Sequence, residues 1–158
     1  MNTGIPMRAD LLASPEYARR MRQFRQAMQQ AGQDAALIFA PQHLRYLLNY
    51  AGEAATALVS NDQCYLITDY RFEAQARQEC ALAQAGCRVI CRDRDKQRLG
   101  EAMALELAAQ QASRVWYEAE QISVQQWQLL LQDLSDLQTS ACPPLLTSLR
   151  MVKDDWEV

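Results

Sequence analysis

The stretch "ATALVSNDQCYLIT", residues 55–68, decides how this chain is expected to fold. Two runs of strand-forming residues flank Asn61 and Asp62, which are residue types that tolerate the left-handed backbone of a tight hairpin turn. The stretch therefore predicts a β-hairpin, and that hairpin puts one antiparallel pair into whatever sheet the rest of the chain builds.

Outside this hairpin, apolar strand-like runs alternate with stretches of helical periodicity. Helices are expected from Ser14, as N-cap, to Gly32, over one or two turns after Pro41, before Gly86, over about 97–111, and after Ser123 with the stripe Val124, Trp127, Leu131 and Leu134. Strands are expected at 34–40, 87–92, 113–118 and, more weakly, 137–141. This alternation predicts a three-layer α/β domain, with a mixed central sheet of about six strands and helices on both faces.

The composition fits an ordinary globular domain. The chain has 158 residues, of which 49% are hydrophobic and 22% charged, enough to bury a core without a disulfide or metal. Its net charge of -3 argues against nucleic acid as a partner. Since no apolar run approaches the roughly 20 residues that cross a bilayer, we expect no membrane partner and a soluble, cytoplasmic protein.

The cysteines favour reduced thiols. There are five, an odd number at irregular spacing, and no secretory signal pattern opens the chain. Cys87 and Cys91 share one face of a predicted strand, but with neither a CxxC pair nor a nearby histidine they make a poor metal site. Burial as small apolar side chains is the favoured interpretation for both.

No catalytic motif is visible. His43 is the single histidine, and without a nucleophile or an orienting partner in the sequence it is interpreted as a surface or helix-start residue. The five glycines stand singly, which excludes a dinucleotide fingerprint or phosphate loop. The residues alone thus favour binding, regulation or assembly over catalysis, with no catalytic residue and no metal ligand in this chain.

The last residues, "SLRMVKDDWEV" at 148–158, have the pattern of an amphipathic helix without a stop signal. Leu149, Val152 and Trp156 fall at i, i+3 and i+7, and charged residues surround them. No glycine or asparagine cap follows, and Pro143-Pro144 separates this helix from the body of the domain.

Three segments together resemble the N-terminal domain of the creatinase, prolidase and aminopeptidase P family of metallopeptidases. They are "RMRQFRQAMQQAGQDAALIFAPQHLRYLLNYAGEAATALV" (20–59), "YLITDYRFEAQA" (65–76) and "LRMVKDDWEV" (149–158). Their order and spacing carry the resemblance, although Tyr70 stands where the family usually has glycine. The resemblance implies a domain over 14–142 and a linker helix over 143–158, with Leu149, Val152 and Trp156 poorly covered by this domain.

The resemblance also implies a function. The expected role is the non-catalytic N-terminal domain of an Xaa-Pro dipeptidase or aminopeptidase, which dimerises and walls the cleft for a proline-containing peptide. The partner would be the protein's own C-terminal catalytic domain, where two divalent metals, manganese, cobalt or zinc, activate a water. The alternative is a protein-binding module of a creatinase-like pseudo-enzyme.

The resemblance draws attention to four residues as substrate-cleft candidates: His43, Tyr46, Asp69 and Arg71. Arginine can clamp a carboxylate through two hydrogen bonds, which favours Arg71 as a ligand contact. Asp69 and Arg71 can equally pair with each other and cap the following helix. Tyr46, like Tyr50, is interpreted as a core or interface aromatic.

Overall fold

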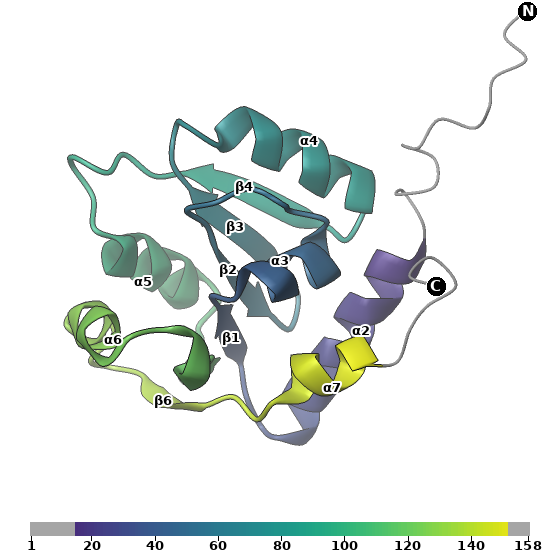
Figure 1. The fold of residues 1–158 in the computed structure, drawn as a ribbon. Coiled ribbons are helices and arrows are strands. Elements are labelled where there is room, and N and C mark those ends of the chain that lie inside the picture. Colours follow the sequence, from purple (N-terminus) through teal and green to yellow (C-terminus); the bar gives the residue numbers. More distant parts are fainter. Residues whose placement is uncertain (1–14, 152–158) are drawn as a thin grey trace, which may run out of the picture.

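The computed structural model describes residues 15–151 and places a mixed sheet between helices (Figure 1). Within these residues the sheet has six strands, in the order β4-β3-β2-β1-β5-β6. The strands are β1 (Ala35–Ile38), β2 (Thr56–Ser60), β3 (Cys64–Thr68), β4 (Cys87–Cys91), β5 (Arg114–Tyr117) and β6 (Gln138–Ala141). The helices are α2 (Pro15–Gln30), α3 (Pro41–Leu48), α4 (Glu73–Ala83), α5 (Leu99–Ala109), α6 (Val124–Leu131) and α7 (Leu145–Met151), with a short 3₁₀ turn at Ala119–Gln121. The predicted architecture is confirmed.

The hairpin forms where the sequence predicts it. Val59 pairs with Cys64 across β2 and β3, and the Ser60 N–H donates to the Gln63 carbonyl oxygen at 2.8 Å. The Ser60 hydroxyl oxygen accepts the Gln63 N–H at 2.9 Å. Among the described residues, positive φ outside glycine occurs at Asn49, Ala54, Gln84 and Gln111. Asn61 and Asp62 therefore close the turn without the left-handed backbone for which they were singled out.

Two hydrophobic cores lie on the two faces of the sheet because successive side chains of a strand point to opposite faces. In β1, Ala36 and Ile38 face the core formed with α2, α3, α4 and α7. Ala35 and Leu37 face the second core, formed with α5 and α6. A strand buried on both faces needs apolar residues at every position, which explains the unbroken apolar runs in the sequence.

The strand directions place the loops that follow β1, β3, β4, β5 and β6 at the same edge of the sheet. β1, β5 and β6 are mutually parallel, as are β3 and β4, whereas β2 is antiparallel to both β1 and β3. Five strands therefore run in one direction, and their carboxyl ends meet the start of β2 at a common edge. In α/β sheets this carboxyl edge is where ligands bind.

Helix α6 begins at Ser123 as expected, but its apolar stripe is shifted. Val124 is 74% exposed, whereas Leu130 and Leu134 are buried. Trp127 stacks on Tyr117 with ring centroids 3.7 Å apart. The predicted stripe is therefore wrong at Val124. Val124 is the first residue of α6 and lies beyond the part of the helix that packs on the sheet.

Replacing Ser123 by alanine is expected to lower the free energy of unfolding by about 1 kcal/mol. The Ser123 hydroxyl oxygen accepts the Gln126 N–H at 3.1 Å, and alanine leaves that donor at the helix start without its cap. Urea unfolding checks the value, with Ser123→Asp retaining the cap and Ser135→Ala, an exposed serine before β6, as the matched control. Equal losses in Ser123→Ala and Ser135→Ala would contradict the capping role.

The C-terminal helix is packed on the domain rather than loosely attached. Leu146 is 2% exposed, and Leu149 is partly buried against the first core, so Leu149 is better covered than expected. Val152 and Trp156 lie outside the described residues. None of the described helices combines the length and apolarity needed to span a membrane.

The interpretation of the cysteines is partly wrong. Cys87 is partly buried, next to the buried Cys64 and Cys80, and contacts with these two thiols raise its pKa. Cys91, however, is exposed, because it is the last residue of β4, a strand at the edge of the sheet.

Candidate functional site

A pocket of about 300 Å³ lies at the carboxyl edge of the sheet. The loop after β3 provides Asp69 and Arg71, and the loop after β4 provides Arg92 and Arg94. The remaining lining residues come mainly from the start of β2 and the end of β3. Three arginines thus share one hollow although Arg71 and Arg92 are 21 positions apart in the sequence, because β3 and β4 are adjacent and parallel.

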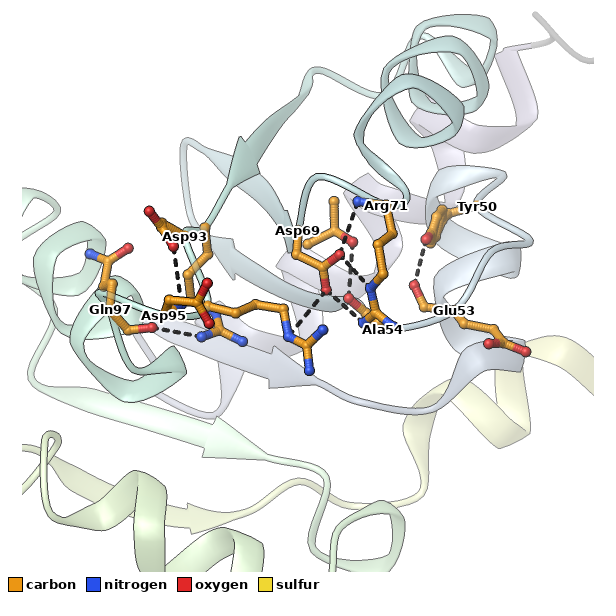
Figure 2. A network of polar contacts seen from close by, with 11 residues as sticks. Tyr50, Glu53, Ala54, Asp69, Arg71, Asp93, Asp95 and Gln97 are labelled. Carbon is orange, nitrogen blue, oxygen red and sulfur yellow. Dashed lines mark hydrogen bonds and ion pairs between the residues drawn. The ribbon is translucent and has the colours of Figure 1, made fainter.

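Asp69 and Arg71 form a tightly paired unit at this pocket (Figure 2). Arg71 Nε donates to Asp69 Oδ1 at 2.9 Å, and Arg71 Nη2 donates to Oδ2 at 2.9 Å. The Arg71 backbone N–H donates to Oδ1 at 3.0 Å. Local pairing, one of the two interpretations of these residues, is therefore present. Helix α4 itself has Phe72 as its N-cap without a side-chain cap bond, so Asp69 orders the preceding turn instead.

The pair combines a buried anion with an exposed cation. Asp69 is 2% exposed, whereas 43% of the Arg71 side chain remains accessible. Hydrogen bonding from Arg71 outweighs the burial of the carboxyl group and lowers the pKa of Asp69 to about 2. Asp69 is thus ionised across the physiological range and fixes Arg71, whose guanidinium carbon lies over the Phe72 ring, 5.4 Å from its centroid. A guanidinium held in this way is preorganised to bind an anion.

The walls of the pocket are held by backbone hydrogen bonds. The Arg92 N–H donates to the Thr68 carbonyl oxygen at 2.7 Å and extends the pairing of β3 with β4 by one residue. The Thr68 hydroxyl donates to the Ala54 carbonyl oxygen at 2.9 Å, and the Tyr50 hydroxyl donates to the Glu53 carbonyl oxygen at 2.6 Å (Figure 2). These bonds tie the loop before β2 to the sheet and fix the pocket's shape.

A second and larger hollow, of about 510 Å³, adjoins the first. It lies between the sheet edge and the helices α5 and α6. Phe39, Leu99, Ile122 and Leu130 give it apolar walls, and Arg98 and Asp133 lie at its polar side. Arg98 Nη2 donates to Asp133 Oδ1 at 2.7 Å and Arg98 Nε donates to Asp133 Oδ2 at 3.2 Å, so Asp133 holds Arg98 by two hydrogen bonds, as Asp69 holds Arg71.

His43 lies in α3 near its start, as interpreted from the sequence, but it is buried rather than on the surface, with 3% exposure. Its Nδ1 pairs with Glu118 Oε2. Glu118 Oε1 accepts the backbone N–H groups of Phe39 and Ala40 at 2.8 and 3.0 Å. Among the described residues, His43 Nε2 is a buried atom without a hydrogen-bond partner. His43, Pro143 and Pro144 are among the residues that line a small cavity of about 30 Å³.

Sequence reasoning missed Glu118 as the partner of His43. The two residues are 75 positions apart and meet because β1 and β5 are parallel neighbours with their carboxyl ends together. A carboxylate directly after a predicted buried strand is the signal that could have found it.

Tyr46 belongs to the core, as interpreted from the sequence. It is 5% exposed, and the guanidinium carbon of the buried Arg20 lies 4.3 Å from its ring centroid. Arg20 Nη1 also donates to the Tyr46 carbonyl oxygen at 3.0 Å. The structure thus brings Asp69 and Arg71 together at one pocket and places His43 and Tyr46 elsewhere.

The described residues contain no group of three or more histidine, cysteine, aspartate or glutamate side chains arranged to hold a metal ion. The three arginines that line the pocket suit it to the recognition of anions.

Comparison with known proteins gives the family. The family model of the creatinase/prolidase N-terminal domain matches residues 20–152. No curated protein sequence matches significantly.

Solved structures share the fold. An Xaa-Pro dipeptidase from Bacillus anthracis has a TM-score of 0.78 at 20% identity, covering 88% of this chain and 37% of that one. An Xaa-Pro aminopeptidase structure from Streptococcus pyogenes has a TM-score of 0.75 at 24% identity, covering 85% and 98%. The N-terminal domain of the cytoplasmic peptidase PepQ from Mycobacterium tuberculosis has a TM-score of 0.72 at 22% identity, covering 84% and 98%. The present chain thus spans little more than a third of the B. anthracis enzyme but nearly all of the isolated PepQ domain, and it belongs to the creatinase/prolidase N-terminal domain family.

Proposed function

We propose that this chain is the non-catalytic N-terminal domain of an Xaa-Pro dipeptidase or aminopeptidase, and that it forms part of the wall of the substrate cleft. The observation that carries the proposal is Arg71, which Asp69 holds by two side-chain hydrogen bonds at the rim of an open pocket. An arginine fixed by a buried carboxylate is suited to position the carboxylate of a peptide substrate.

The family and the fold support this assignment. The names of the similar structures are those of Xaa-Pro peptidases, and one of them is an isolated N-terminal domain. Nothing in these comparisons supports the alternative of a pseudo-enzyme that binds proteins.

The proposal includes a catalytic domain that continues from this chain. That domain would hold two divalent metals, manganese, cobalt or zinc, which activate the attacking water. The protein would act as a cytoplasmic homodimer on proline-containing peptides. In such an assembly this domain contributes positioning, and hydrolysis depends on the other domain.

The expected result for Arg71→Ala in the complete protein is a loss of roughly 10- to 100-fold in kcat/KM, since a charge-assisted hydrogen bond contributes about 1.5–3 kcal/mol. The assay uses an Xaa-Pro dipeptide and a longer Xaa-Pro peptide with added manganese. Arg88→Ala is the matched control, because Arg88 is exposed on β4 and lines neither hollow.

Two outcomes separate the parts of the proposal. Absence of hydrolysis of both substrates by the complete protein would overturn the peptidase assignment. Hydrolysis that Arg71→Ala leaves unchanged would keep the peptidase assignment and remove Arg71 from the substrate cleft. The chain of 158 residues alone is expected to hydrolyse neither peptide.

A further inference from the structure

The two hollows at the carboxyl edge form one continuous surface. They share Thr56, Arg92, Arg94 and Leu99 as lining residues. Arg92 and Arg94 thus stand between the smaller, polar hollow and the larger one with apolar walls. A pocket of about 510 Å³ has the size of small-ligand sites in proteins.

The shared arginines carry charge that nearby carboxylates do not neutralise. Arg92 Nη1 donates to a neutral group, the Gln97 carbonyl oxygen, at 2.6 Å. Arg94 Nε lies 3.8 Å from Asp69 Oδ2, at the outer limit of an ion pair. That carboxylate is already engaged by Arg71. Although the chain has a net charge of -3, the two hollows together are lined by four arginines (Arg71, Arg92, Arg94 and Arg98) and two acids (Asp69 and Asp133), so this site is locally positive.

The apolar part of the surface lies directly beside these cations. Leu99 lines both hollows next to Arg94, and Leu129, at the outer wall, is 57% exposed. Leu99 is also the first residue of α5, so the positive end of this helix dipole faces the pocket. An occupant that matches both features needs an anionic group next to an aliphatic group.

The rim adds groups that recognise a peptide backbone. Gln121, Gln126 and Gln132 line the larger hollow. The amides of Gln121 and Gln132 each offer a donor and an acceptor, which is the combination that peptide N–H and C=O groups require, whereas the amide oxygen of Gln126 already accepts the Ser123 N–H. A small inorganic anion would use none of these amides and none of the apolar wall.

We propose that the joined surface binds a peptide through a carboxylate at Arg92 and Arg94 and an adjacent aliphatic side chain in the hollow between α5 and α6. Arg71 lies in the smaller hollow of the same surface, but the proposed peptide contacts are those of Arg92, Arg94 and the larger hollow, and they concern binding by this chain alone. Its test measures peptide binding and does not depend on whether the complete protein has peptidase activity.

Calorimetric titration of the chain with short blocked peptides tests the proposal. N-acetyl-Leu-Glu-amide is expected to bind about tenfold more tightly than N-acetyl-Leu-Gln-amide, and also more tightly than N-acetyl-Gly-Glu-amide. N-acetyl-Leu-Leu with a free carboxyl end shows whether a terminal carboxylate serves as well as a side chain. Binding of N-acetyl-Leu-Leu adds to the support but does not replace the required difference between the Leu-Glu and Leu-Gln peptides, and inorganic phosphate is the probe for charge alone.

Variants locate the site. Arg94→Gln is expected to weaken the Leu-Glu peptide about tenfold, whereas the control Arg88→Gln leaves its affinity unchanged. Leu129→Asp, which places a negative charge on the exposed apolar wall, should weaken it as well. Both side chains are substantially exposed, so the variants keep the fold. Equal affinity for the Glu and Gln peptides, phosphate binding as tight as that of the Leu-Glu peptide, or an unchanged Arg94→Gln titration would each overturn the proposal.

Discussion

Glu118→Ala is expected to lower the free energy of unfolding by about 3–5 kcal/mol, the largest loss expected from a single polar substitution in this domain. The Glu118 side chain is 8% exposed and accepts from the Phe39 and Ala40 N–H groups while it pairs with His43. Alanine leaves these donors without an acceptor in a largely buried site, and each unsatisfied buried donor is costly.

Urea unfolding of Glu118→Ala measures this loss, with Glu120→Ala as the control because Glu120 is exposed in the adjacent 3₁₀ turn. A double-mutant cycle with His43→Ala separates the His43 contact from the two backbone contacts. If Glu118→Ala costs no more than Glu120→Ala, the buried pair does not stabilise the end of β1.

Asp69→Asn is expected to lower stability by about 2 kcal/mol at neutral pH and to have almost no effect near pH 2. The folded-state pKa of Asp69 is about 2, below the ordinary value of 3.8. A group whose pKa is lowered by folding stabilises the folded state above its ordinary pKa, and this stabilisation is lost as the pH falls toward the folded value. The contribution of Asp69 is therefore complete above about pH 5 and disappears between about pH 4 and pH 2.

Denaturant unfolding of the original chain and of Asp69→Asn at pH 7, 5 and 3 checks this difference. Asp95→Asn is the control, since Asp95 is an exposed acid in the loop after β4. A difference between Asp69→Asn and the original chain that stays constant from pH 7 to pH 3 would contradict the assigned role of the Asp69 carboxylate.

Most of the fold could be predicted from local sequence patterns. The hairpin at residues 55–68, the break at Pro41 and the cap at Ser123 are each encoded within a few neighbouring residues, and the structure has all three elements. Errors occur where the surroundings decide. Val124 follows the helical period but lies beyond the sheet, and Cys91 follows the strand period but ends an edge strand.

The candidate site was predictable only in part. Asp69 and Arg71 are two residues apart, so their pairing follows from a local turn. The position of Arg92 and Arg94 beside them depends on β4 lying next to β3, and the His43–Glu118 pair depends on β5 lying next to β1.

The sequence by itself determined the strands and helices, the hairpin and the family, because periodicity, caps and turn residues act over short distances along the chain. Only the tertiary structure decided which charged side chains share a pocket and which become buried pairs. The physical reason is that strand order and direction bring together loops that are far apart in sequence, and burial then sets the electrostatic character of each group that they carry.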